Sequence, residues 1–314
     1  MGGTKILAAA INSHDGIIAR VKKETPSGNE KEKYIRSLAD IVEEVTDELR
    51  LSESDVKAVC LGVPGSVNPK TGIIGLAPNL RLKNFNIGER LSKLIPYPVL
   101  IENDVNLGAL GIKKFGVGMN AKNMLVVFIG TGIGGGLIFN EKIYRGSNFV
   151  AGEIGHMVVE KNGPLCGCGN RGCIEAVASR TAIVRNIEKD IKSGKKSVLS
   201  GFVKNKERIK SRALSQAVNQ KDPVAVKRLS EACESIGVML AGVSNLLNVD
   251  MIVLGGGVIE AMGKFMMPMI KKAFKENVMQ SSAKGLKIIP SKLGDDAALY
   301  GGIPLAEEFL GVIV

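Results

Sequence analysis

Three short apolar runs, each followed directly by a glycine-rich turn, constrain the fold of this chain most strongly. The runs cover residues 59–63, 125–129 and 251–254, and their turns begin at Pro64, Gly130 and Gly255. Continuous apolar runs of this length are typical of strands that are buried on both faces. Glycine in the following turn lets the backbone come close to a ligand. The pattern predicts buried strands that end in ligand-facing turns.

Helical patterns separate these runs. Residues 34–49 place six apolar side chains on one helical face. In residues 226–247 the apolar side chains recur at alternating intervals of three and four positions. Such spacing is typical of amphipathic helices that bury one stripe. Strands that alternate with helices predict an α/β fold. Cys60 lies inside the first apolar run and Cys233 on the stripe of the second helix, so we expect both thiols in the core.

The positive charge is concentrated in one segment. The 314 residues, enough for two domains, carry a formal charge of +11. Residues 185–212 hold ten Lys or Arg and three acidic residues, which leaves +4 for the rest of the chain. Phe202 is the one aromatic residue there on which a base could stack, and no zinc-finger, RRM or helix-turn-helix motif accompanies it. The segment predicts a solvated helical face, and we expect no nucleic-acid partner.

The number of cysteines and the hydropathy of the sequence indicate the cellular compartment of the protein. The chain has five cysteines, an odd number, and three of them fall within residues 166–173. This clustering favours metal ligation over a secreted disulfide framework. No signal-peptide pattern opens the sequence, and the longest apolar stretch, at 236–259, is broken by polar residues. We therefore expect a cytoplasmic protein with no membrane partner.

The glycine turns predict phosphate binding, because exposed backbone N–H groups bind anions. Residues 130–135 satisfy the spacing GxGxxG. A dinucleotide-binding domain would need a helix next, whereas residues 136–140 have the pattern of a strand and a turn. A β-hairpin at 130–136 is therefore favoured over a Rossmann fold. The chain has neither GxxxxGKS/T nor the HRD and DFG motifs, which argues against P-loop and protein-kinase chemistry.

Seven short motifs occur in the order found in the ROK family of sugar kinases. They are GGTK at 2–5, GVPGSV at 62–67, APNL at 77–80, ENDVN at 102–106, GTGIGGG at 130–136, GEIGH at 152–156 and CGCGNRGCIE at 166–175. One motif alone is a weak signal, but the ordered set covers essentially the whole chain. The sequence therefore resembles this family, and most closely its bacterial glucokinases.

The resemblance implies a two-lobed α/β fold of the hexokinase/actin (ribonuclease H-like) type, with a cleft that closes on substrate. Residues 1–105 would form the small lobe, to which a C-terminal helix at 301–314 returns. Residues 106–300 would form the large lobe with the cysteine motif. The implied assembly is a homodimer or a higher homo-oligomer.

The implied reaction is transfer of the γ-phosphate of ATP to the 6-hydroxyl of glucose, with Mg²⁺ neutralising phosphate charge. Kinases for N-acetylmannosamine, N-acetylglucosamine or fructose stay open as alternatives within the family. A sugar-responsive transcriptional repressor is a further alternative, since ROK repressors share this core. Such repressors add an N-terminal DNA-binding region, for which we expect no room in a chain that starts at a phosphate turn.

The motif at 102–106 supplies the candidate catalytic group. A carboxylate at a strand end can accept the proton of a hydroxyl that attacks phosphorus. From the residues alone, Asp104 is better explained as the N-cap of a following helix. The resemblance instead assigns it the role of general base. It also implies that Asn103 holds sugar hydroxyls and that Gly65 and Asn79 contact the sugar.

Further binding residues follow from the remaining motifs. Glu153, His156 and Glu175 offer carboxylates and an imidazole to vicinal sugar hydroxyls, with surface acids and a structural histidine as the alternative. The turns are expected to face ATP. The residues expected at phosphate are Gly2, Gly3, Thr4, Lys5, Gly130, Thr131 and Gly132, and those bordering adenosine are Gly255, Gly256 and Gly257.

One nitrogen and three sulfurs come together at the cysteine motif, from His156, Cys166, Cys168 and Cys173. This donor set fits structural tetrahedral Zn²⁺. The spacing is not that of a zinc finger, and three reduced cysteines in a glycine-rich loop are the alternative. The family's zinc ligands fall on these four positions, so the resemblance favours the metal, with His156 linking it to the sugar pocket.

The start of the sequence departs from the family pattern. Relatives have an apolar strand and Asp-x-Gly-Gly-Thr-Lys where this chain has Met1 at the x position. We expect residues 6–11 to be the second arm of a hairpin whose first arm, with its Asp, lies outside the chain. Loss of that strand would leave backbone groups unpaired. Loss of the Asp, expected to orient Mg²⁺ and the phosphates, would reduce activity.

Overall fold

The computed structural model describes residues 5–26 and 31–312, which form two compact units. Unit 1 comprises residues 1–120, 136–151 and 295–314, and unit 2 comprises residues 121–135 and 152–294. Each unit is therefore built from segments far apart in the sequence. Gly2, Gly3 and Thr4, expected at phosphate, lie outside the described residues. The predicted division into lobes at residue 105 stays a prediction.

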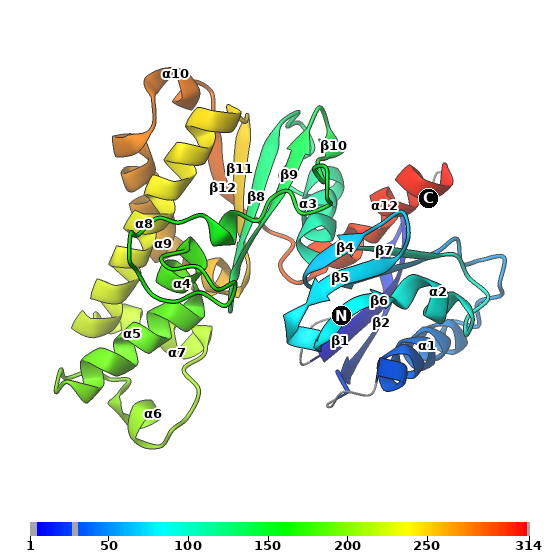
Figure 1. The fold of residues 1–314 in the computed structure, drawn as a ribbon, viewed down its shortest axis with the longest axis horizontal. Helices are drawn as coiled ribbons and strands as arrows, with labels where there is room; N and C mark the ends of the chain where they lie inside the picture. Colours follow the sequence, from blue (N-terminus) through cyan, green and yellow to red (C-terminus); the bar gives the residue numbers. More distant parts are fainter. Residues whose placement is uncertain (1–4, 27–30, 313–314) are drawn as a thin grey trace. The chain divides into compact units, whose positions relative to one another are not determined.

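Three small sheets lie entirely within the described part of unit 1 (Figure 1). The first is the antiparallel pair of β1 (Lys5–Asn12) and β2 (Gly16–Glu24), and the second is the parallel pair of β3 (Val59–Val63) and β7 (Val99–Asn103). The third is antiparallel, in the order β4 (Ser66–Asn68), β5 (Ile73–Ala77) and β6 (Leu82–Asn86). The predicted strands at 6–11 and 59–63 are confirmed.

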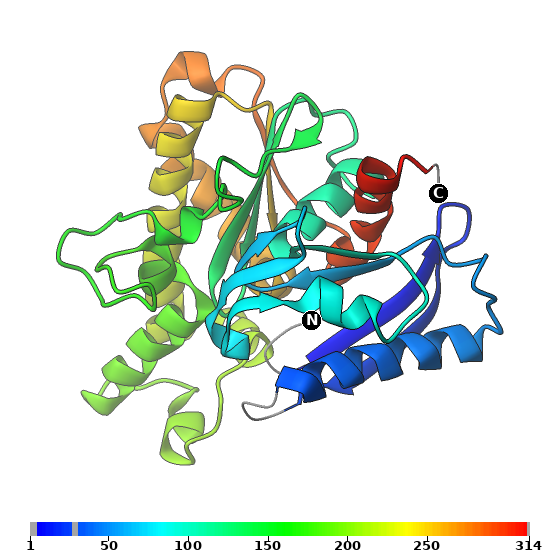
Figure 2. The ribbon, with the colours of Figure 1, turned by 45° about the vertical axis from the view of Figure 1, so that its right-hand side comes forward.

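Helices cover these sheets. They are α1 (Lys31–Glu48), α2 (Ile87–Ser92), α3 (Asp104–Phe115), α11 (Asp296–Tyr300) and α12 (Gly302–Leu310). The apolar face predicted at 34–49 is the buried face of α1, where Ile35 and Ile41 are each 1% exposed. That face packs along β1 and β2 (Figures 1 and 2). The helix α3 packs against α11 and α12.

Unit 2 is built on a buried parallel sheet. The strands β8 (Met124–Ile129), β11 (Met251–Gly255) and β12 (Lys287–Pro290) lie side by side in that order, with β9 (Ile133–Phe139) on the other side of β8. The residues of β11 are all buried, as expected for a strand covered on both faces. Residues 136–139 of β9 belong to unit 1, and within that unit Ile138 and Phe139 pair with β10 (Lys142–Ile143).

The turn at 130–132 leads into β9, a strand. The predicted hairpin arm at 136–140 is therefore confirmed, and a Rossmann unit, which needs a helix at this point, is excluded. The apolar stripe predicted at 226–247 belongs to α8 (Pro223–Leu247), which packs against α9 (Gly257–Asn277). Cys233 is fully buried on that stripe, as predicted.

Short helices complete unit 2. They are η2 (Ile154–His156), α4 (Ile174–Ala178), α5 (Arg180–Lys192), α6 (Ser200–Lys204), α7 (Ser211–Asn219) and α10 (Gln280–Ala283). Among the described residues, no helix combines the length and the apolar character needed to span a bilayer.

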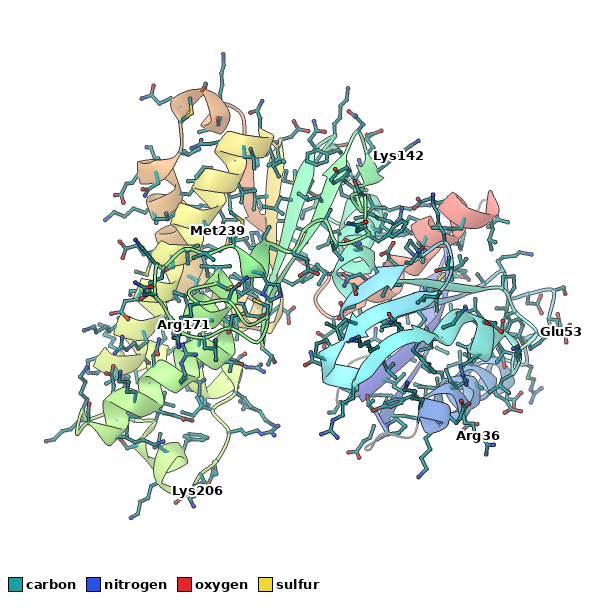
Figure 3. The ribbon with its side chains drawn as sticks, viewed as in Figure 1. Arg36, Glu53, Lys142, Arg171, Lys206 and Met239 are labelled. Atoms are coloured by element: carbon teal, nitrogen blue, oxygen red, sulfur yellow. The ribbon has the colours of Figure 1, made fainter. Side chains whose placement is uncertain are left out.

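The basic segment at 185–212 runs from α5 into α7. Its apolar residue Ile187 is buried, whereas Lys189 and Lys206 are exposed; Figure 3 shows Lys206 at the surface of unit 2. The segment also contains Asp190, which is 4% exposed. The Arg228 guanidinium donates to both Asp190 carboxylate oxygens at 2.8 Å, and Lys195 Nζ donates at 2.7 Å. The hydrogen bonds from Arg228, and to a smaller extent from Lys195, hold the pKa of Asp190 well below its usual range.

Candidate functional site

The carboxyl ends of β3 and β7 lie side by side in unit 1, because the two strands are parallel and Val63 is opposite Asn103. The turn after β3 contains Gly65, and the turn after β7 is the start of α3. Asn103 Nδ2 donates to the Gly65 carbonyl at 2.9 Å, which joins the two turns. Gly65 has φ +105°, and a Cβ there would lie 2.2 Å from the Leu76 carbonyl oxygen, so only glycine fits. In open α/β sheets this edge is where ligands bind.

Asn103 is the N-cap of α3. Its Oδ1 accepts from the backbone N–H of Val105 at 2.9 Å and of Asn106 at 3.1 Å, which satisfies two of the unpaired donors at the helix start. The alternative interpretation of Asp104 as the N-cap is therefore wrong by one residue. Asn103 takes the cap, and the Asp104 carboxylate accepts from the Val105 backbone N–H at 3.0 Å.

Asp104 is the first residue of α3 and stands at the end of β7. Burial raises the pKa of its carboxyl above the ordinary aspartate value. The positive end of the helix dipole favours the carboxylate form at such a position. A partly desolvated carboxylate at a ligand-binding strand edge has the properties that a general base requires.

A buried ion pair supports the β7–α3 junction. Glu102 is 1% exposed, and its Oε1 accepts from the backbone N–H of Asn103 at 2.8 Å and from Asn106 Nδ2 at 3.0 Å. Arg145 Nε donates to Glu102 Oε2 at 2.6 Å, and its two terminal nitrogens donate to the Glu308 carboxylate of α12 at 2.6 and 2.8 Å. The turn that presents Asp104 is therefore tied through Arg145 to the C-terminal helix.

In unit 2, two glycine turns emerge from one edge of the parallel sheet. The strands β8 and β11 are parallel, with Phe128 opposite Gly255, so the turns at Gly130–Gly132 and Gly255–Gly257 follow neighbouring strand ends. The 21-residue helix α9 begins at Gly257, and its N-cap Gly256 has no side chain to satisfy the first N–H groups. Backbone donors at such an end favour an anion.

Arg180 brings a cation to the first of these turns, and the sequence analysis missed it. Its Nη2 donates to Thr131 Oγ1 at 2.6 Å, and its backbone N–H donates to the Gly130 carbonyl at 3.0 Å. Thr181 Oγ1 donates to the Thr131 carbonyl at 2.8 Å. The signal that could have found Arg180 is the polar triplet at 179–181, at the start of a helix. Thr131 itself is exposed.

Glu175 joins the same turn from the other side. Its Oε2 accepts from the Ile133 backbone N–H at 3.0 Å. A Cβ on Gly132 would lie 2.2 Å from this oxygen, so glycine at this position leaves room for the carboxylate in its present orientation. Its Oε1 lies 3.9 Å from Cys166 Sγ. Glu175, predicted to hold sugar hydroxyls, is thus placed between the glycine turn and the cysteine loop.

The four predicted metal ligands converge in unit 2. The ligand atoms of His156, Cys166, Cys168 and Cys173 all lie within 4.8 Å of one another. Cys166 Sγ is 3.5 Å from His156 Nδ1, and Cys168 Sγ is 3.7 Å from Cys173 Sγ. A tetrahedral ion with 2.3 Å metal–sulfur bonds has sulfur–sulfur edges of about 3.8 Å. The residues present therefore fit a structural Zn²⁺ ion.

The structure also places the other residues that the sequence predicted to bind sugar or phosphate. His156 Nε2 lies 3.8 Å from Glu153 Oε2, so one ring nitrogen faces the sulfurs and the other faces a carboxylate. Asn79 is exposed on η1 (Pro78–Leu80) of unit 1, between β5 and β6. Lys5 is the exposed first residue of β1. Within unit 1 the structure brings Gly65, Asn103 and Asp104 together, and within unit 2 it brings Glu153, His156 and Glu175 together with the cysteines.

Comparison with known proteins defines the class. Residues 1–308 match the model of the ROK family. A glucokinase of Halalkalibacterium halodurans is 32% identical over 303 residues, which cover 96% of this chain and 92% of that protein. The chain therefore belongs to the ROK family.

Solved structures agree with this assignment. A ROK glucokinase of Streptomyces griseus, crystallised with glucose and AMPPNP, has a TM-score of 0.85 and 30% identity, and the match covers 98% of this chain and 97% of that one. A ROK transcriptional regulator, a homolog of the E. coli MLC protein, has a TM-score of 0.88 and 26% identity, with 98% and 76% covered. The predicted hexokinase/actin-like α/β fold class is confirmed.

Proposed function

We propose that this chain is an ATP-dependent hexose kinase that phosphorylates the 6-hydroxyl of glucose. One observation carries the proposal: Asp104, with its raised pKa, stands at a ligand-binding strand edge in a chain similar to glucokinases. The Gly130–Gly132 turn with Arg180, and the open N-terminus of α9, supply the anion-binding groups that a nucleotide needs.

In the proposed reaction the Asp104 carboxylate accepts the proton of the sugar 6-hydroxyl while that oxygen attacks the γ-phosphorus of MgATP. The bond between O6 and phosphorus forms, the bond from phosphorus to the bridging oxygen breaks, and ADP leaves. Asn103 holds the β7–α3 turn so that the carboxylate keeps its orientation. Arg180 and the glycine N–H groups stabilise the charge on the phosphates.

The cysteine cluster has a structural role in this proposal. With a metal bound, His156, Cys166, Cys168 and Cys173 fill all four positions, which leaves no site for a substrate or water. The ion would fix a glycine-rich loop that ends at Cys173, the N-cap of α4, and Glu175 lies in the first turn of that helix. His156 and Glu153 are then held as hydrogen-bonding groups for sugar hydroxyls.

The test is the specificity constant, kcat/KM, for ATP with glucose, mannose, fructose, N-acetylglucosamine and N-acetylmannosamine. Glucose is expected to give the highest value. A clear preference for an acetamido sugar or for fructose would overturn the glucose assignment and leave a hexose kinase. No turnover with any of these sugars would overturn the kinase itself.

The similarity to a ROK transcriptional regulator supports a second candidate, a sugar-responsive DNA-binding protein. The match covers 98% of this chain and 76% of that regulator, which supports a core common to the two proteins. Sequence-specific binding of a duplex that persists at 0.15–0.2 M salt would support this candidate, because non-specific binding falls steeply with salt.

A further inference from the structure

The three thiols of the cysteine cluster differ in their access to solvent. Cys166 and Cys173 are 4% and 0% exposed, whereas Cys168 is an exposed residue. Cys168 stands between Gly167 and Gly169, and a Cβ built on either glycine would meet nothing within 4 Å beyond its chain neighbours. The Cys168 sulfur is therefore carried by an uncrowded part of the loop, where a small solute can reach it.

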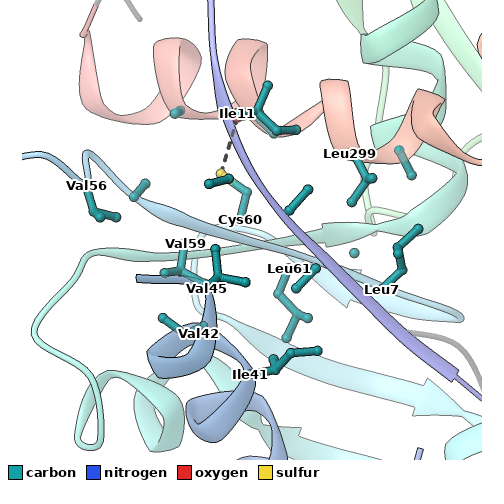
Figure 4. A pocket seen from close by; sticks show the side chains of 18 of the residues that line it. Leu7, Ile11, Ile41, Val42, Val45, Val56, Val59, Cys60, Leu61 and Leu299 are labelled. Atoms are coloured by element: carbon teal, nitrogen blue, oxygen red, sulfur yellow. Dashed lines mark hydrogen bonds between the residues drawn. The ribbon is translucent and has the colours of Figure 1, made fainter. Parts of the chain in front are cut away.

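The two thiols outside the cluster are shielded from solvent. Cys60 is partly buried in unit 1, and its Sγ donates to the Gly302 carbonyl at 3.2 Å, the dashed contact in Figure 4. Cys233 is fully buried on the apolar stripe of α8. All five cysteines are among the described residues, so Cys168 is the most accessible thiol of the chain.

Cys168 has a second thiol directly beside it. Its Sγ lies 3.7 Å from Cys173 Sγ. A disulfide bond is about 2.05 Å long, so the two sulfurs would have to approach by about 1.7 Å. Cys173 is held as the N-cap of α4, and a Cβ on Gly172 before it would lie 1.7 Å from the Glu160 carbonyl oxygen. Because the loop is closely packed there, we expect the approach to come from Cys168.

Cys166 has different neighbours. Its Sγ is 3.5 Å from His156 Nδ1 and 3.9 Å from Glu175 Oε1. The sulfur of Cys166 therefore contacts the imidazole and the carboxylate, whereas the sulfur of Cys168 contacts that of Cys173. This arrangement selects one pair of thiols within the cluster.

We propose that Cys168 is an oxidation site, at which a hydroperoxide forms a reversible disulfide between Cys168 and Cys173 and so opens the metal cluster. An accessible thiol next to a second thiol that can resolve it is the arrangement of redox-sensing cysteines. The inference rests on the structural metal of the proposed function. It adds a regulation to that site, because the metal is kept under reducing conditions and lost in the presence of peroxide.

Two steps complete the oxidation. The Cys168 thiolate attacks one oxygen of hydrogen peroxide, the O–O bond breaks, and a sulfenic acid and hydroxide form. The Cys173 thiolate then attacks the Cys168 sulfur, the S–O bond breaks, and hydroxide leaves as the S–S bond forms. Two protons from solvent convert both hydroxides to water. Two thiolates are thus oxidised to one disulfide, and one hydrogen peroxide is reduced to two waters.

The loss of two ligands has an effect beyond the cluster. His156 and Cys166 would remain, whereas a structural zinc ion is held by four ligands. Glu175 lies beside Cys166 and also accepts from the Ile133 N–H of the glycine turn at 3.0 Å. Oxidation is therefore expected to release the ion and to weaken nucleotide binding at this turn.

The test treats the purified full chain with hydrogen peroxide. Zinc release is followed with a chromogenic chelator, and the thiol pairing is read from peptide masses after the unfolded chain is alkylated. We expect zinc to leave in step with a Cys168–Cys173 disulfide, while Cys166 stays open to alkylation. A thiol reductant with added Zn²⁺ should restore the metal. Zinc release without this disulfide, or a disulfide that includes Cys166, would overturn the proposal.

Two matched substitutions each keep a metal-binding side chain. Cys168→His removes the accessible thiol and should slow zinc release by about tenfold or more, because buried structural cysteines are inert. Cys166→His leaves both proposed partners in place and should release zinc at close to the parent rate. The peptide masses apply with or without metal: the disulfide should form in Cys166→His and not in Cys168→His. Equal behaviour of the two variants would contradict the proposal.

Measurements before peroxide is added separate this proposal from the proposed function. A chain without kinase turnover that still releases zinc as the disulfide forms would contradict the kinase and support the oxidation site. A chain with full turnover whose zinc and thiols are indifferent to peroxide would do the reverse.

Discussion

Arg145 and Glu102 form a buried ion pair, with Nε and Oε2 2.6 Å apart and the two side chains 13% and 1% exposed. Glu102 immediately precedes the capping residue of α3, and it bonds the Asn103 N–H. The pair therefore acts on the turn that presents Asp104, although Arg145 itself is 41 residues beyond Asp104 in the sequence.

The first prediction concerns this pair. Arg145→Met leaves a buried carboxylate without its partner, which typically costs about 3–5 kcal/mol. We expect that loss in the free energy of unfolding, measured with urea, and a lower kcat with little change in the KM for sugar. The double variant Arg145→Met/Glu102→Gln removes the stranded charge and should recover part of both. A double variant as damaged as the single one would show that the charge is not the cause.

The second prediction concerns Asp104. Asp104→Asn should lower kcat by about 10²- to 10⁴-fold, the usual contribution of a general base, and should change the KM for sugar much less. The exposed residue Asp47 provides the matched control, and Asp47→Asn should retain full activity. A kcat within a few-fold of the parent would remove Asp104 from the mechanism.

The same residue sets a pH dependence. The base acts as a carboxylate, so kcat/KM should rise with pH through the pKa of Asp104. Burial raises that pKa above the ordinary value of about 3.9. The acid limb of the profile is therefore expected at a higher pH than an ordinary aspartate would give in the parent, and it should be absent in Asp104→Asn.

The third prediction is one zinc ion per chain. Cys173→Ser and Cys166→Ser should each reduce the zinc content, measured by elemental analysis of protein purified without chelator, to near zero and should lower Tm. Cys60 and Cys233 are not members of the cluster, and burial raises the pKa of each thiol to about 12, so neither is a ready ligand. Cys60→Ser and Cys233→Ser should retain the metal. Parent protein that is metal-free, active and equally heat-stable would contradict the role.

The fourth prediction concerns Arg180 at the glycine turn. A hydrogen bond from a charged group typically contributes about 1.5–3 kcal/mol, which corresponds to roughly 10- to 100-fold in affinity. We therefore expect Arg180→Gln to raise the KM for ATP by that factor while the KM for sugar stays unchanged. Lys189 is exposed on the same helix, and Lys189→Gln should have no effect. Equal effects of both substitutions would point to general electrostatics.

The fifth prediction concerns stability against acid. The pKa of Asp190 is depressed in the folded chain, so the carboxylate stabilises the fold above its unfolded pKa of about 3.9 and loses that contribution as the pH falls below it. Asp190→Asn should therefore unfold more easily than the parent at pH 7, by about 1–3 kcal/mol. The difference should shrink toward pH 2. A gap that is constant with pH would show a packing effect.

The elements that the sequence predicted well are those with a strong local pattern. The apolar runs at 59–63, 125–129 and 251–254 and the stripes of α1 and α8 depend on side-chain periodicity alone, and each became the predicted strand or helix. The hairpin at 130–136 was predictable because the residues after the turn lack a helical pattern. The four candidate zinc ligands converge as their residue types suggested.

Other features depend on contacts that no local pattern records. The cap of α3 is Asn103 and not Asp104, because α3 begins directly after β7 and Asp104 is already its first helical residue. A charged residue within a strand pattern was a possible signal for Glu102, whereas no pattern marks Arg145, its partner from a distant loop. The contact of Arg180 with Thr131 likewise joins residues 49 positions apart.

Glu175 touches both the glycine turn, through the Ile133 N–H, and the cysteine loop, beside Cys166. Because one carboxylate contacts both, its orientation contributes to two binding equilibria at once. Coupling of this kind is reciprocal: the factor by which a bound metal changes nucleotide affinity equals the factor by which nucleotide changes metal affinity. In the proposed kinase, nucleotide supply and metal retention would therefore be linked quantities, and the chelator concentration needed to remove the metal would change when nucleotide is present.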